Sequence, residues 1–242
     1  MTSACFKQNQ RGVTLIELMI AISLVAILVA GLLTAMRAGL LTYEKTGQRL
    51  DANRRNMSVQ QILSNHLENA VPVAGLCPSS DSGKPSTSLP FFAGTETWLR
   101  LVSTYSISEG SRGAPRIVEY QAQPIAGGGF RLAVAEHPYM NAASTAAYCG
   151  DLRPHPVELG VTPVVLADRL AFCRFAYHPP YDGFSYQEIP WVNVWDAQYP
   201  KLPAGVRVEM KSAAPLIGLP VVSLTIPLRA DRNPLAQYAD TF

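Results

Sequence analysis

A long apolar run near the N-terminus constrains the fold of this chain more than any other feature. Between Val13 and Met36 the sequence holds one ionisable side chain, Glu17. The 19 residues from Leu18 to the end of this run would span roughly 29 Å as a helix, close to the thickness of a bilayer's hydrocarbon core. The run is too long for the apolar part of a secretory signal, and no small-residue cleavage site follows it. The sequence therefore predicts a membrane-spanning helix over residues 13–37.

Glu17 is an unfavourable residue for a simple membrane anchor. A charge within the bilayer costs roughly 2.5–3.5 kcal/mol on insertion scales. Leucine at this position would anchor the chain without that cost. The carboxylate therefore indicates a partner for the helix.

The distribution of proline separates the chain into two parts. All 19 prolines lie at Pro72 or later, and proline in a helix interior costs about 3 kcal/mol or more. The first 71 residues are therefore predicted to be mostly helix, ended by Pro72. Within residues 38–71, apolar side chains at helical spacing predict an amphipathic continuation that packs on a domain. His66 lies beside this apolar stripe and is interpreted as a partly buried core histidine.

The sequence of residues 72–242 predicts an antiparallel sheet domain. Residues 71–95 are rich in Ser, Pro and Gly and are expected to form an irregular connection. The predicted strands are Trp98–Tyr105, Arg116–Gln123, Phe130–Ala135, the alternating segments 171–177 and 206–210, and Val221–Leu228. The last strand is expected to pair antiparallel with the one before it, and Gly127–Gly129 to form a hairpin turn. Without a second long helix, the fold class is α+β, a long helix packed on an antiparallel sheet.

Composition and spacing argue against several classes of function. The net charge of +2 is close to balanced, so nucleic-acid binding has no electrostatic support. His137, His155 and His178 each precede proline and are interpreted as loop residues, not metal ligands. No zinc or calcium motif and no catalytic arrangement is visible. We therefore expect no enzyme activity, no cofactor and no metal.

The segment Gly12-Val-Thr-Leu-Ile-Glu17, followed by the apolar run, resembles the class III prepilin signal of type IV pilins and type II secretion pseudopilins. The resemblance implies that a membrane peptidase cuts between Gly12 and Val13 on the cytoplasmic face and methylates the new amine. Residues 1–12 would then be a leader peptide. Glu17 would become the fifth residue of the mature chain, and its carboxylate would pair with the amine of a neighbouring subunit and set the register between helices. Val13 stands where the family usually has phenylalanine.

Later segments are similar to the J-type minor pseudopilins of type II secretion, and together they cover most of the chain. They are Leu89-Pro-Phe-Phe-Ala-Gly94, Leu99-Arg-Leu-Val-Ser103, Arg116-Ile-Val-Glu-Tyr120, Gly128-Gly-Phe-Arg-Leu132, Leu166-Ala-Asp-Arg-Leu-Ala-Phe172, the region of Trp195, and Leu202-Pro-Ala-Gly-Val-Arg-Val208. This resemblance implies a pilin-like fold and a non-catalytic subunit of the pseudopilus tip complex. Such a subunit would help to initiate assembly of the pseudopilus and support protein export across the outer membrane.

The resemblance also implies a location and a set of partners. The chain would cross the bacterial inner membrane once, with residues 72–242 in the periplasm. Its partners would be I- and K-type minor pseudopilins, the major pseudopilin, the prepilin peptidase and the inner-membrane assembly platform. Two other interpretations stay open: a type IV minor pilin that primes a surface pilus, and a membrane-anchored periplasmic enzyme. The N-terminal helix alone does not separate the two pilin-like roles.

The periplasm permits disulfides, and three cysteines would follow the leader. Cys77 and Cys149 lie in loop-like sequence and are the preferred pair. Cys173 is then expected to be a small buried hydrophobic residue. The aromatic residues between 181 and 195 are consistent with either an interface patch or core packing. They are Tyr181, Phe184, Tyr186, Trp191 and Trp195.

Overall fold

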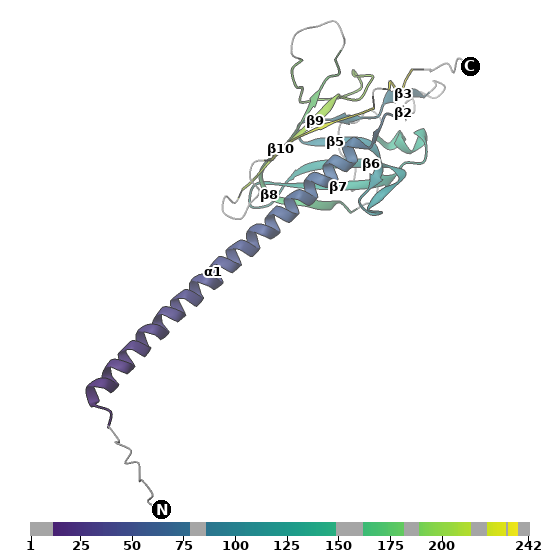
Figure 1. Cartoon of the computed structure of the whole chain (residues 1–242). Helices are drawn as coiled ribbons and strands as arrows, with labels where there is room; N and C mark the ends of the chain where they lie inside the picture. The colour runs from purple at the N-terminus through teal and green to yellow at the C-terminus, as the bar shows by residue number, and fades with distance from the viewer. Residues whose placement is uncertain are drawn as a thin grey trace, which may run out of the picture. The chain divides into compact units, whose positions relative to one another are not determined.

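The computed structural model describes residues 12–77, 86–148, 162–181, 189–213, 222–230 and 232–236 (Figure 1). The chain divides into two compact units, Met1–Asp51 and Ala52–Phe242. The first contains the N-terminal part of the long helix, and the second contains its C-terminal turns together with the sheet.

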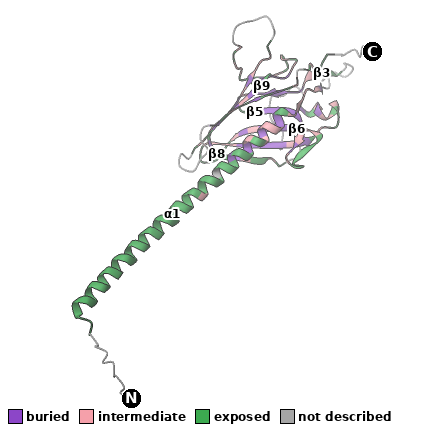
Figure 2. Cartoon of the chain, viewed as in Figure 1, coloured by how far each residue is buried: buried purple, intermediate pink, exposed green. Residues whose placement is uncertain are grey.

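Helix α1 runs from Leu15 to Glu68, which confirms the predicted long N-terminal helix. It contains one stretch that is long and apolar enough to cross a membrane, judged by length and composition. The side chains of that stretch are exposed, and burial begins only in the C-terminal turns of the helix (Figure 2). The same helix therefore changes from an apolar rod to an amphipathic element along its length.

The helix ends three residues earlier than the sequence predicted. Asn69 follows the last helical residue, and both its backbone N–H and its side-chain amide donate to the carbonyl of Asn65, at 3.3 and 2.7 Å. Residues 70 and 71, which the sequence assigned to the helix, form strand β1 (Ala70–Val71) and pair with Ser103 and Val102. A capped end and new sheet hydrogen bonds thus stop the helix before Pro72.

An antiparallel sheet dominates the second unit. After β1, its strands are β4 (Ala93–Gly94), β5 (Trp98–Ser106), β6 (Ser111–Pro124), β7 (Phe130–Pro138), β8 (Val164–His178), β9 (Gly205–Ser212) and β10 (Val222–Pro227). They follow the order β1-β5-β6-β7-β8-β9-β10, with β4 also pairing with β5. Helix and antiparallel sheet together form the α+β, pilin-like fold that the sequence predicts.

The core lies between the C-terminal turns of α1 and one face of the sheet. Val59, Leu63 and Leu67 are buried on the helix side. Facing residues from six strands, β5 to β10, complete this cluster, among them Leu101, Tyr120, Leu132, Phe175 and Val208. A smaller cluster of Phe91, Val102, Ile117 and Tyr148 is separate from the first. The alternation along β5, with Leu101 in one cluster and Val102 in the other, is what a sheet covered on both faces requires.

Two connections contain more structure than the sequence predicted. Within the expected irregular segment 71–95, β2 (Ala74–Cys77) pairs with β3 (Thr87–Pro90) as a separate two-stranded sheet. A 3₁₀ helix, η1, covers Ala142–Tyr148, and the Thr145 hydroxyl accepts a hydrogen bond from the backbone N–H of Leu76 at 3.0 Å. This tertiary contact joins two short segments whose sequences are typical of loops. Neither segment has a periodic pattern from which its structure could be predicted.

The turn and pairing predictions for the later strands are confirmed. Gly127, Gly128 and Gly129 all have positive φ angles, between 91° and 97°, and connect β6 to β7 as a hairpin turn. Strands β9 and β10 pair antiparallel, from Val222 opposite Met210 to Pro227 opposite Gly205. Backbone conformations at positive φ favour glycine because it lacks a Cβ atom, which explains why three of them occur together here.

The burial of Leu63 leads to a stability prediction. Leu63→Ala removes a fully buried side chain from the helix–sheet core and should lower the free energy of unfolding by about 2–5 kcal/mol. Thermal unfolding followed by circular dichroism measures the effect. The matched control is Met57→Ala on the same helix, because Met57 is 70% exposed and its loss should change stability by less than about 0.5 kcal/mol. Equal effects of the two changes would contradict this packing.

Candidate assembly site

The helix begins at a threonine cap that places Glu17 in its first turn. The backbone carbonyl of Thr14 accepts hydrogen bonds from the N–H groups of Glu17 and Leu18 at 3.1 and 3.2 Å. Its side-chain hydroxyl also accepts a longer one, 3.4 Å, from the Glu17 N–H. A negative side chain in the first turn is favoured by the partial positive charge of the helix N-terminus. The spacing Thr14-x-x-Glu17 is that of a capping box, a signal that could have identified Thr14 from sequence.

The apolar side chains after this cap are exposed on every side of the helix. Leu15, Ile27, Leu28 and Leu32 are exposed by 68–77%. In water, such a surface would be strongly unfavourable at about 25 cal/mol per Å². Among the described residues, Glu17 forms no ion pair. This part of the helix therefore presents one carboxylate within an apolar surface, an arrangement suited to lipid and to other apolar helices.

The two residues at the expected cleavage position lie before the helix. Gly12 is exposed and outside any helix or strand, and Val13 is 75% exposed. An accessible backbone outside regular secondary structure is what a peptidase needs at the bond it cuts. The rest of the expected leader, residues 1–11, lies outside the described residues.

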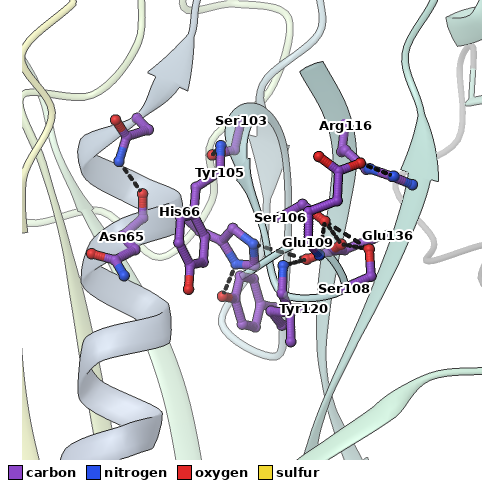
Figure 3. Close-up of polar contacts among 12 residues, drawn as sticks. Asn65, His66, Ser103, Tyr105, Ser106, Ser108, Glu109, Arg116, Tyr120 and Glu136 are labelled. Atoms are coloured by element: carbon purple, nitrogen blue, oxygen red, sulfur yellow. Dashed lines mark hydrogen bonds and ion pairs between the residues drawn. The ribbon is translucent and has the colours of Figure 1, made fainter. Parts of the chain in front are cut away.

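In the second unit, a buried polar network connects the last helical turns to the sheet (Figure 3). His66 is fully buried, and not partly buried as the sequence suggested. Its Nε2 lies 3.1 Å from the Glu136 Oε1 on β7, and its Nδ1 lies 2.5 Å from the Tyr120 hydroxyl on β6. Since the Glu136 carboxylate can only accept, Nε2 donates to it, and in the neutral tautomer Nδ1 accepts a hydrogen bond from the Tyr120 hydroxyl. The histidine is thus held by two strands at once.

Glu136 is the centre of this network. Its carboxylate also accepts hydrogen bonds from the Ser106 hydroxyl at 2.7 Å and from the Ile107 N–H at 2.6 Å. Burial alone would raise the pKa of this carboxyl, but the hydrogen bonds from His66, Ile107 and Ser106 outweigh it and lower the pKa from 4.5 to about 2. Burial raises the pKa of Tyr120 well above its usual value, so the hydroxyl stays protonated and can donate. The network fixes the helix register on the sheet.

The other polar candidates differ in part from the sequence interpretation. His137 lies in β7, not in a loop, where burial lowers its pKa, and its Nε2 is 3.9 Å from the Glu119 carboxylate. His178 ends β8, and its ring lies 5.0 Å from that of Trp191. His155 lies outside the described residues. In the described ranges, no group of three or more His, Cys, Asp or Glu side chains could hold a metal.

The cysteines and aromatic residues can be placed only in part. Cys77 ends β2 and is disulfide-bonded. Cys149 lies outside the described residues, so its pairing with Cys77 stays a prediction. Cys173 is a buried free thiol, as expected for a small core residue. Trp195 is fully buried and stacks on Tyr199 with ring centres 3.9 Å apart, which settles it as core packing.

The structure describes two of the remaining aromatic residues of the predicted patch. Tyr181 is 64% exposed, and Trp191 is half-buried beneath the guanidinium of Arg207, 4.0 Å from its ring centre. Phe184 and Tyr186 lie outside the described residues. An interface patch formed by these residues therefore stays a prediction.

The N-terminal part of α1 matches a known family motif. Residues 7–33 match the prokaryotic N-terminal methylation motif. The match includes the expected cleavage position, the Thr14 cap and Glu17, and it supports a type IV pilin-like protein, either a pilin or a pseudopilin. No curated protein matches the chain. The methylation motif together with the apolar helix indicates anchoring in a membrane by a single N-terminal helix and a structural role for the protein.

The lowered pKa of Glu136 leads to a prediction about pH. A carboxyl whose pKa is lower in the folded state stabilises the fold above its unfolded pKa, and this contribution is lost as the pH falls through the folded value. The melting temperature should therefore decline between about pH 4.5 and pH 2. Glu136→Gln should lower stability at pH 7 by about 1–3 kcal/mol and make this decline shallower. Thermal unfolding measured across that pH range tests both effects.

The control for this pH experiment is Glu109→Gln. Glu109 lies in the turn between β5 and β6 and pairs with Arg116 at 2.6 Å, and exposed pairs contribute about 0–1 kcal/mol. A shallower pH dependence in this control than in Glu136→Gln, or an unchanged stability of Glu136→Gln at pH 7, would contradict a stabilising role for the buried network.

Proposed function

We propose that this chain is a J-type minor pseudopilin of a type II secretion system, a subunit of the complex that initiates the pseudopilus. The single observation that carries the proposal is the N-terminal helix: a methylation motif, a carboxylate in the first turn and an exposed apolar surface in one continuous segment. A helix of this kind serves to join other helices within and above a membrane. The segments around Gly94, Leu101 and Tyr120, which resemble J-type subunits, favour that member of the group.

Processing would create the partner that Glu17 needs. Cutting between Gly12 and Val13 leaves a positive amine four residues before Glu17, at the start of the apolar run. In a bundle of such helices, the amine of one subunit meets the carboxylate of another in surroundings of low dielectric constant, where opposite charges attract strongly. The pair would also fix the axial register, because a shift along the helix would leave both charges unpaired.

The sheet domain would then supply the contacts that distinguish this subunit from its neighbours. The buried network around His66 and Glu136 holds the last helical turns to the domain. Movement of the helix during assembly would therefore carry the domain with it. No catalytic step is assigned to the protein, whose work would be organisational, with its domain in the periplasm and its helix in the inner membrane.

Substitution of Glu17 tests this function. We expect Glu17→Leu to insert into bacterial membranes normally but to reduce co-isolation with the pseudopilins of the same genome by more than about tenfold, because the partner's amine would be left unpaired. The matched control is Glu44→Leu, which removes an exposed carboxylate from the same helix beyond the apolar run. Full assembly by Glu17→Leu, or equal loss in both variants, would contradict the proposal.

Partner binding separates the two pilin-like roles. The full chain in detergent should bind I- and K-type minor pseudopilins and not the minor pilins of a surface pilus. Specific binding to the pilus subunits alone would instead make this chain a type IV minor pilin.

A further inference from the structure

The two edges of the main sheet, at β1 and at β10, differ in how they are covered. At one end, β5 is covered by short strands, with Val71 opposite Val102 and Gly94 opposite Leu99. At the other end, β10 pairs with β9 and with no other strand in the described part of the chain. None of the β10 residues, Val222–Pro227, forms a hydrogen bond to any element other than β9. As far as the described residues go, the backbone groups along the outer edge of β10 are therefore available for pairing.

The composition of β10 does not protect this edge. Natural edge strands are commonly blunted by charged side chains, by bulges or by proline. The sequence Val222-Ser-Leu-Thr-Ile-Pro227 contains no charge, and its register with β9 runs without a shift. Its proline is the last residue, so it interrupts only one end. Over five residues the edge is regular, uncharged and favourable for strand formation.

The side chains of β10 alternate between the two faces of the sheet. Val222 and Ile226 are buried on the core face, and Leu224 between them is only half-buried. Ser223 and Thr225 are exposed on the opposite face. The apolar row is therefore incompletely covered at its centre, where a further strand would cover it.

The order of these residues is symmetric about Leu224. A hydroxyl side chain lies on each side of it, Ser223 and Thr225, and a β-branched apolar side chain lies beyond each of those, Val222 and Ile226. Two antiparallel copies centred on Leu224 therefore place like with like: hydroxyl opposite hydroxyl and β-branched opposite β-branched. Cross-strand pairs of both kinds stabilise sheets, and a two-fold interface requires this self-complementarity.

We propose that β10 pairs antiparallel with β10 of a second copy of this chain, with the two-fold axis at Leu224. In this register Ser223 lies opposite the partner's Thr225, and Val222 lies opposite the partner's Ile226. Strand β9 adds a compatible charge pattern on the exposed face, since Glu209 is next to Ser223 and Arg207 is next to Thr225. Across the two copies, each cross-strand row therefore runs from Glu209 through Ser223 to the partner's Thr225 and the partner's Arg207, with an acidic residue at one end and a basic residue at the other. The pairing does not depend on the function proposed above.

Charge substitutions at the two hydroxyl positions test the register. Analytical ultracentrifugation of the full chain in detergent should show a concentration-dependent dimer. In the double variant Ser223→Lys, Thr225→Lys, like charges face each other twice, and dimerisation should weaken by at least about tenfold. In the double variant Ser223→Lys, Thr225→Glu, each introduced lysine faces an introduced glutamate, and the dimer should return. Melting temperatures of both variants report whether the fold is intact.

Cysteine cross-linking provides a second readout that does not rely on the lysine variant folding. In a Cys5→Ser background in native membranes, Leu224→Cys chains should link to each other, because the two copies of this residue meet at the axis. Ser223→Cys chains should link to Thr225→Cys chains and not to themselves. A monomeric wild-type chain at all concentrations, a dimer that persists in the double lysine variant, or absence of the Leu224→Cys link would each overturn the proposal.

Discussion

Helix α1 is apolar and exposed in its N-terminal part and packs on a sheet in its C-terminal turns. The rest of the structure depends on this difference. Over its first turns α1 exposes apolar side chains on every side and one carboxylate, Glu17. From Val59 onward, one side of the helix is buried against a sheet. The N-terminal part of the helix cannot be stable in water as it stands, so lipid or other helices must surround it. That requirement, together with the methylation motif, indicates a protein anchored in a membrane by this helix.

The domain end of the helix is held by two kinds of contact with different roles. Leu63 and Leu67 bury apolar surface, which stabilises the contact but does not fix its direction. His66 adds directional hydrogen bonds to Tyr120 and Glu136 on adjacent strands. A turn or a slide of the helix would break these bonds in a buried site, where unpaired polar groups are costly. The apolar contacts therefore supply stability, and the polar network defines one position.

Much of the fold follows from periodicity in the sequence, and the exceptions have physical causes. The long helix and the β9–β10 pair were predictable because a 3.6-residue or two-residue pattern runs through each of them. The first half of β8 was not predictable, because Val164 and Val165 are both exposed and Arg169 has a φ of 54° beside a β-bulge. At the candidate site, Glu17 stands out locally within an apolar run. The His66–Glu136 contact joins residues 70 positions apart and leaves no local pattern.

The most direct test of this account is the mass of the N-terminal peptide of the protein purified from bacterial membranes. We predict a chain that starts at Val13, carries one additional methyl group on its amine, and has Glu17 as its fifth residue. Such a terminus would place the positive amine where the carboxylate of a neighbouring helix can reach it. An assembled protein that retains residues 1–12, or that is cut at another bond, would contradict the account.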